Sequence, residues 1–270
     1  MSDRVVIERL AGGVADVRLN RPDKMNALDI AMFEALVAAG QELSRDASLR
    51  AVVLSGEGRA FSAGLDFTSF QGMAGGGGGR SGPNLLTRDG ASAANFAQRA
   101  AWVWTEVPVP VIAAVHGVAY GGGLQIALGA DLRVVASDAR LSVMEIKWGL
   151  VPDMSGTQTL RRLVRLDVAK ELTFTGRVVS GTEAVALGLA TRVADPPRET
   201  ALALAAEIAA KSPDAIRAGK RLLDASGVVP VEEGLLLEER LQIGLIGRPN
   251  QVESVRANLE KRPPQFRDPA

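Results

Sequence analysis

The order of short apolar strands and amphipathic helices constrains the fold of this chain more than any other feature of its sequence. Over the first 195 residues, short apolar runs alternate with longer segments in which apolar residues recur every three or four positions. The runs indicate strands at 50–56, 110–117 and 132–138, and the periodic segments indicate helices at 28–43, 92–107 and 121–131. This strand-strand-helix repeat predicts an α/β fold of stacked turns, with helices packed on sheets.

Glycines and polar residues mark the boundaries of several of these elements. Residues 5–10 and 13–20 are predicted to form a hairpin around Gly12 and Gly13. Asp29 stands at the start of the first periodic segment and is a candidate helix cap. The glycine tract at 75–79 is too flexible in composition to be predicted as part of a packed element.

From about Pro196 onward the pattern changes to helices alone. The helical segments cover residues 198–212, 213–226, 231–247 and 250–262. Ser212 followed by Pro213 is typical of a cap and a first-turn proline. We therefore divide the chain into a core at 1–195 and a helical region at 196–270. Apolar faces on these helices predict contact with another subunit.

Composition excludes several classes of function. Lys and Arg number 31 and so do Asp and Glu, so no net field is expected to recruit nucleic acid or an anionic membrane. There is no cysteine, and His116 is the single histidine, which excludes disulfides and a multi-histidine metal site. No secretory signal and no apolar run near the ~18 residues of a membrane helix are present, which predicts a cytoplasmic protein.

Two acids lie eight residues apart in the segment "MEIKWGLVPD". Glu145 and Asp153 are separated by Pro152, so their spacing is not that of a helix face. Asp153 has a structural explanation as an N-cap, because 154–158 reads as a helix start. Glu145 has no such explanation, and it is the candidate proton-transfer residue of this segment.

Two glycine-bearing turns are candidates for holding a ligand with backbone N–H groups. One is "FSAGLDF" at 61–67, and the other is the Gly121–Gly123 run before an apolar helix. Each is also compatible with an ordinary tight turn, and neither has the GxGxxG or GK[ST] pattern of nucleotide binding. Two N–H groups on one oxygen, with a carboxylate nearby, suit chemistry beside a thioester carbonyl, where an enolate forms.

Six blocks of the sequence resemble one known family. They are "LNRPDKMNAL", "GRAFSAGLDF", "PVIAAVHGVAYGGGLQIALGADLRV", "GLVPDMSGTQTLRRLV", "FTGRVVSGTEAVALGLATRV" and "NLEKRPPQF", which begin at residues 19, 58, 110, 149, 174 and 258. In this order they are similar to the enoyl-CoA hydratase/isomerase (crotonase) superfamily, over nearly the whole chain. The resemblance implies a crotonase (ClpP-like) spiral of ββα turns with a C-terminal helical trimerisation region.

The resemblance also implies a ligand and a site. The substrate is expected to be an acyl thioester of coenzyme A, with no separate cofactor and no metal. The backbone N–H groups of Leu65 and Gly122 are expected to form an oxyanion hole, and the glycine tract to lie near the acyl pocket. The residues expected to contact CoA are Lys24, Ala63, Asp66 and Lys261, the last from a neighbouring subunit of a homotrimer or a dimer of trimers.

The acid positions separate the reactions of this family. Hydratases carry two glutamates; the second corresponds to Glu145, and the first corresponds to Gln125, an amide that cannot accept a proton at neutral pH. Dienoyl-CoA isomerases keep an acid at the Asp153 position, although they also have an aspartate at the Gln125 position. We therefore expect Glu145 as the base, Asp153 as a second acid or base, and Gln125 orienting water or the acyl chain.

The first expectation is thus a double-bond isomerase acting on an unsaturated acyl-CoA. An isomerase of mono-unsaturated chains that uses Glu145 alone also fits the residues. Three further readings stay open: an enoyl-CoA hydratase, an acyl-CoA binding protein with little catalysis, and a CoA-thioester hydrolase, since an oxyanion hole alone does not choose the reaction.

Overall fold

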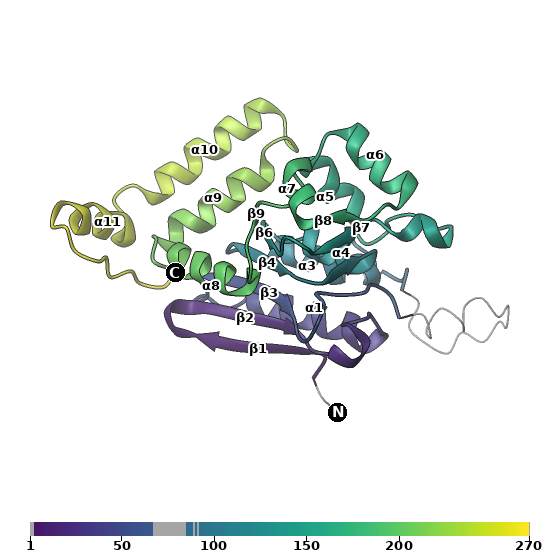
Figure 1. Cartoon of the computed structure of the whole chain (residues 1–270). Helices are drawn as coiled ribbons and strands as arrows, with labels where there is room; N and C mark the ends of the chain where they lie inside the picture. Colours follow the sequence, from purple (N-terminus) through teal and green to yellow (C-terminus); the bar gives the residue numbers. More distant parts are fainter. Residues whose placement is uncertain (1–2, 67–84, 89, 91, 270) are drawn as a thin grey trace.

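The strands of the computed structural model, which describes residues 3–66, 85–88, 90 and 92–269, form two sheets (Figure 1). The glycine tract at 75–79 lies outside the described residues. The larger sheet has the order β1 (Val5–Leu10), β2 (Val14–Leu19), β3 (Ala51–Gly56), β4 (Val111–Val115), β6 (Leu132–Val135) and β9 (Arg192–Val193). The smaller has the order β5 (Val118–Tyr120), β7 (Arg140–Ser142) and β8 (Val179–Ser180). The β1–β2 and β7–β8 pairs are antiparallel, and the other pairs are parallel.

The predicted strand-strand-helix repeat is present as successive turns of the chain. Strand β4 is followed by β5 and α4 (Gly122–Leu128), and β6 by β7 and then α5 (Gly156–Leu163). In the two preceding turns a short bridge replaces the second strand, before α1 (Ile30–Ser44) and before α3 (Phe96–Glu106). These bridges pair Leu28 with Leu65 and Ser62 with Ala119. The turns therefore stack through both sheets, as the predicted spiral requires.

The central strands are buried on both faces because helices cover each side of the large sheet. Side chains of Ala51, Val53 and Ile112 face α8 (Pro197–Ala209), where they pack with Ala201 and Ala205. The alternate residues of β3 and β4 belong to a larger core on the opposite face. This alternation follows from the two-residue period of a strand.

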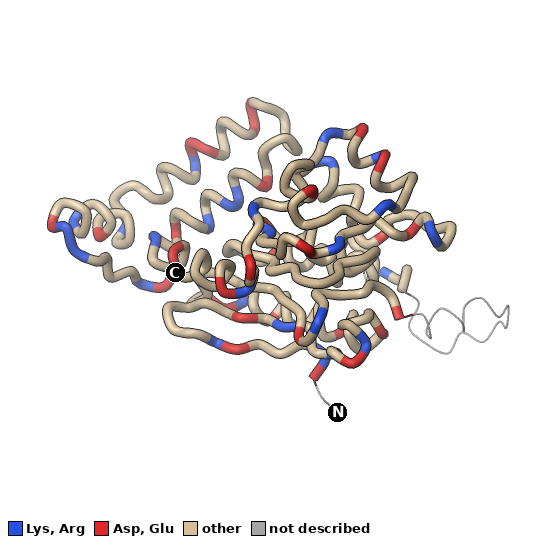
Figure 2. The backbone as a smooth tube through the Cα atoms, in the orientation of Figure 1, with Lys and Arg blue, Asp and Glu red and all other residues tan. Residues whose placement is uncertain are grey.

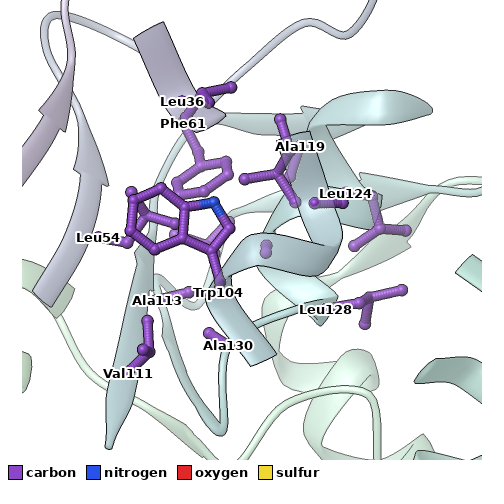
Figure 3. Close-up of a cluster of buried hydrophobic side chains, with 14 of the residues drawn as sticks. Leu36, Leu54, Phe61, Trp104, Val111, Ala113, Ala119, Leu124, Leu128 and Ala130 are labelled. Carbon is purple, nitrogen blue, oxygen red and sulfur yellow. The ribbon is translucent and has the colours of Figure 1, made fainter. Parts of the chain in front are cut away.

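Trp104 is a central anchor of the larger core (Figure 3). The ring lies among Leu54, Phe61, Leu124 and other buried side chains, and its Nε1 donates to the carbonyl of Ala100 at 3.1 Å. The buried indole nitrogen thus has a partner within α3, as a buried polar atom requires.

Local signals for helix starts are partly confirmed. The Asp29 side chain caps α1 by accepting from the Met32 N–H at 2.9 Å, and the predicted hairpin turns at η1 (Ala11–Gly13). Ser212 does precede Pro213 at the start of α9 (Pro213–Ala225), but its side chain makes no capping hydrogen bond. The capping explanation for Asp153 is wrong, because α5 begins later, with Ser155 at its N-cap position.

The helical region begins inside the core and then leaves it. Helix α8 covers the large sheet, whereas α10 (Val231–Leu245) and α11 (Pro249–Leu259) project away from the sheets beside α9 (Figure 1). The remaining helices, α6 (Leu166–Thr175) and α7 (Gly181–Leu187), lie near the small sheet. Figure 2 shows basic and acidic residues interspersed over the described chain. The boundary at 195/196 stays a prediction.

Candidate functional site

One cavity brings the predicted turns and acids together. It has a volume of about 320 Å³ and lies between the bridge at 63–65, the start of α4 and the segment 144–154. Its described lining is mostly apolar. The lining residues are Phe33, Ala63, Gly64, Leu65, Leu85, Leu86, Ala97, Tyr120, Gly121, Gly122, Met144, Glu145, Trp148, Leu150, Asp153 and Met154.

The bridge between residues 28 and 65 leaves one N–H of the 63–65 turn unused. Leu28 donates to the Gly64 carbonyl at 2.8 Å, and the Asp66 N–H donates to the Leu28 carbonyl at 3.1 Å. Alternation of the backbone then turns the N–H of Leu65 away from Leu28. Among the described residues this N–H has no acceptor. The Leu65 backbone is therefore a free donor at the cavity wall.

Glycine conformations bring a second donor close to the first. Gly121 has φ +50°, and helix α4 begins at the next residue, Gly122. The first hydrogen bond of that helix is donated by Gln125 to the Gly121 carbonyl, so the N–H of Gly122 has no partner within the helix. Gly64 has φ +85°, and a Cβ there would lie 2.5 Å from the Tyr120 carbonyl oxygen and 3.7 Å from the Gly122 nitrogen. A side chain at position 64 would therefore force the two turns apart.

Glu145 presents one bonded and one unbonded carboxylate oxygen. It is the first residue of η3 (Glu145–Trp148), and its side chain is 9% exposed. Its Oε1 accepts from Gln125 Nε2 at 2.6 Å, whereas Oε2 has no partner among the described residues. Burial raises the pKa of this carboxyl. Hydrogen bonds from its own backbone and from Gln125 oppose that rise, and the charge of Asp153 adds a smaller increase. The group is thus a buried carboxyl with one oxygen available for proton exchange.

Gln125 stands behind the cavity wall. It is 2% exposed on α4 and is not among the described lining residues. Its Oε1 accepts from the N–H groups of Met154 and Gly156, each at 2.8 Å. In this structure the Gln125 side chain contacts Glu145 and the 154–156 backbone, and its expected role toward water or the acyl chain stays a prediction.

Asp153 lines the cavity at its edge. Its side chain reaches solvent, yet the surrounding protein is close enough for burial to raise the pKa of its carboxyl. Glu145 and Asp153 are the charged residues of the described lining, which includes no lysine or arginine. Two carboxyls with raised pKa values on one apolar cavity are the groups suited to moving protons there.

The four residues expected to contact CoA have different positions. Ala63 lines the cavity, and Lys24 is exposed at the end of η2 (Pro22–Lys24). The Asp66 carboxylate is buried and pairs with Arg21 at 2.7 Å. Lys261 follows α11, which lies away from α4 and from the sheets (Figure 1). Lys261 therefore does not face the cavity of its own chain.

Sequence reasoning did not identify the apolar wall of the cavity. Trp148 is 50% exposed and lines the cavity with Leu86 and Leu150. Lys147 Nζ lies 5.7 Å from the centre of its ring, a cation–π contact. The sequence signal for this role of Trp148 was its position three residues after Glu145. The turn that holds both residues is too short to show a periodic pattern.

The described residues give no support for a metal site or for a membrane-spanning helix, and the single histidine has a structural partner. His116 is partly buried and its Nε2 lies 2.9 Å from the Gly58 carbonyl, as expected for a satisfied histidine. No group of three or more Asp, Glu or His side chains there is arranged to hold a metal ion. None of the helices within the described ranges has the length and apolar character needed to cross a membrane.

Comparison with known proteins agrees with this architecture. Residues 9–269 match the profile of the family described as Enoyl-CoA hydratase/isomerase. A putative enoyl-CoA hydratase of Thermus thermophilus is 38% identical over 257 residues, covering 94% of this chain and 98% of that protein. The mitochondrial Delta(3,5)-Delta(2,4)-dienoyl-CoA isomerase of mouse is 33% identical over 263 residues, covering 92% of this chain and 77% of that protein.

Solved structures have the same fold. A probable enoyl-CoA hydratase/isomerase from Mycobacterium abscessus superposes with a TM-score of 0.87 at 31% identity, covering 98% of this chain and 99% of that one. An enoyl-CoA hydratase from Mycobacterium smegmatis gives 0.84 at 32% identity, covering 97% and 98%. With its stacked turns and the match of nearly its whole length, this chain belongs to the enoyl-CoA hydratase/isomerase family and has the crotonase fold.

Proposed function

We propose that this enzyme shifts a double bond along the acyl chain of an unsaturated acyl-CoA. The proposal rests on Glu145 Oε2 and on the N–H groups of Leu65 and Gly122, which belong to residues that line one cavity and have no hydrogen-bond partner in the described part of the chain. One base beside two oxyanion donors is the minimum that enolate chemistry needs. Coenzyme A enters as part of the substrate, and no separate cofactor takes part.

The reaction is a proton transfer through an enolate. The thioester oxygen accepts from Leu65 and Gly122, each donor contributing about 3 kcal/mol to the stability of the developing anion. Glu145 removes a proton from a carbon near the carbonyl, and the electrons delocalise onto that oxygen. The proton then returns at a carbon further along, from Glu145 in a mono-unsaturated chain or from Asp153 at the far end of a dienoyl chain. With a mono-unsaturated chain Glu145 is ionised again after each turnover. With a dienoyl chain Glu145 ends protonated and Asp153 ionised, so Glu145 must lose a proton to solvent and Asp153 must gain one before the next turnover.

Hydration is the second candidate function, because several of the similar proteins are named enoyl-CoA hydratases. In its favour, Glu145 can accept a proton from water. Against it, the amide at position 125 carries no exchangeable acid proton, and its acceptor oxygen already has two donors. Isomerisation needs no water, so it makes better use of a cavity whose described lining is mostly apolar.

Substitution of the base tests the mechanism. E145Q keeps the shape and the contact to Gln125 but cannot accept a proton, so turnover of enoyl-CoA and dienoyl-CoA should fall by about 10²–10⁴. D153N should slow only the dienoyl substrate if Asp153 delivers the far proton. Product-resolved assays over both substrates measure this. Unaltered rates in E145Q would remove Glu145 from the mechanism, and rapid hydration of crotonyl-CoA by the parent enzyme would favour the hydratase.

The raised pKa of Glu145 predicts the pH dependence. The base acts when ionised, so kcat/KM should fall as the pH drops through a value above the ordinary glutamate range. Because the folded-state pKa lies above the unfolded one, ionising this carboxyl removes stability as the pH rises. E145Q should therefore unfold at neutral pH at no lower temperature than the parent. Thermal melts across pH check this point and also control for folding.

The apolar wall predicts a preference for longer acyl chains. W148A removes half-exposed apolar surface from the cavity edge, which should cost about 2 kcal/mol, roughly thirtyfold in kcat/KM, for chains long enough to reach it. Four-carbon substrates should be unaffected. I146A is the matched control, since Ile146 is exposed on the same turn but is not among the described lining residues. Equal loss at every chain length would assign Trp148 a structural role.

The projecting helices predict assembly. Large apolar side chains are exposed along α10 and α11, among them Leu235, Ile243 and Leu259. We infer that a second copy covers them in a homotrimer or a dimer of trimers, which would also bring Lys261 to a neighbouring site. Sedimentation equilibrium should give three or six chain masses, and L235E combined with I243E should lower that mass. A parent protein that is monomeric at micromolar concentration would contradict this.

A further inference from the structure

One amide side chain connects both candidate acids. Gln125 donates from Nε2 to Glu145 Oε1, and through Oε1 it accepts from Met154, the residue immediately after Asp153, and from Gly156. All three contacts are between 2.6 and 2.8 Å, and the side chain is almost fully buried. These bonds span 20, 29 and 31 residues of sequence, so they hold separate turns of the spiral in register.

The two backbone donors decide which way round the amide lies. Met154 and Gly156 both offer N–H groups, so the atom they share must be the amide oxygen and the other atom must be the nitrogen. The nitrogen is only a donor, so Glu145 Oε1 must accept. A proton on Glu145 therefore resides on Oε2, the oxygen that has no partner among the described residues.

The surroundings leave this arrangement little freedom. A Cβ at Gly156 would lie 2.5 Å from Gln125 Oε1, so the close approach of the 154–156 backbone depends on glycine. On the other side of the carboxylate, a Cβ at Gly121 would lie 3.2 Å from Glu145 Oε1. The bonded oxygen is thus enclosed, and exchange of the roles of Oε1 and Oε2 would break the contact to the amide.

We propose that Gln125 is a positioning residue that makes Oε2 the one oxygen of Glu145 that exchanges a proton with the substrate, and that holds the turn of Asp153 in place. The inference rests on the proposed function for the identity of that proton. For a mono-unsaturated chain a C–H bond breaks as the Oε2–H bond forms, and the reverse occurs at the second carbon. For a dienoyl chain Asp153 gives the second proton, and exchange with solvent restores both carboxyls. Asp153 is the other charged group that acts on Glu145, and the described lining adds no cation.

The substitution Q125E separates the two roles of the amide. A glutamate at this position keeps an acceptor oxygen for Met154 and Gly156 but turns a second oxygen, in place of the donor, toward Glu145. Two carboxylates at this distance must share a proton, which raises the apparent pKa of the pair. Isomerase kcat/KM at neutral pH should fall about tenfold or more, recover as the pH rises, and leave KM nearly unchanged. Q125M, which loses every contact, should instead be less active at all pH values and less stable.

Titration of the Glu145 carboxyl needs no turnover, so it tests the positioning role of Gln125 separately from the proposed isomerase function. In protein labelled with ¹³C at glutamate carboxyl carbons, the Glu145 signal is identified by its loss in E145Q, and its midpoint should move upward in Q125E. Q158E is the matched control, because Gln158 is an exposed amide on α5; its added charge should leave the midpoint in place. An unmoved midpoint in Q125E would overturn the positioning role. A moved midpoint in an enzyme without isomerase activity would support the positioning of Oε2 and reject only the reaction.

Discussion

The ionised form of Glu145 in a mostly apolar cavity depends on hydrogen bonds to its carboxylate, from its own backbone and from Gln125. Burying an isolated carboxylate is so unfavourable that it normally stays protonated. The bond from Gln125 offsets part of that cost at Oε1, whereas Oε2 is buried and has no partner among the described residues. The remaining burial keeps the pKa raised, which makes Oε2 a stronger base than an exposed glutamate. The same desolvation that makes ionised Glu145 unfavourable for stability therefore makes it useful for taking a proton from carbon.

The second constraint is the approach of two backbone turns. The bridge to Leu28 occupies the peptide groups on either side of Leu65, and Gly121 turns the chain so that Gly122 begins a helix. Both free donors belong to the main chain, so the identity of the Leu65 side chain matters little for them. What cannot vary is the backbone: at Gly64 a Cβ would collide with the Tyr120 carbonyl. The donors are thus held by sheet register and by packing rather than by flexible side chains, which is the preorganisation that an oxyanion site requires.

These features differ in how far the sequence alone could predict them. The stacked turns and the terminal helices follow from periodicity, which is a local property, and the cap at Asp29 follows from the residues beside it. The three contacts of Gln125 join residues at least 20 positions apart, and no local pattern contains them. Asp153 was open to a capping role because the residues after it read as a helix start. Ser155 has φ +67°, so the helix begins only after it. The sequence alone does not predict this left-handed conformation for a serine. The free state of the two N–H groups likewise depends on pairings between separate turns.

The amide at position 125 also bears on which reaction the cavity favours. Hydration must deprotonate a water and deliver a proton to the neighbouring carbon, so two acid–base groups near one water make it efficient. In this chain the position behind Glu145 holds a side chain that is already committed to three partners and lies outside the described lining. The second acid is Asp153, an exposed residue that lines the same cavity. In the proposed double-bond shift, two acids on one mostly apolar cavity would serve protons that leave and arrive at different carbons of the same acyl chain.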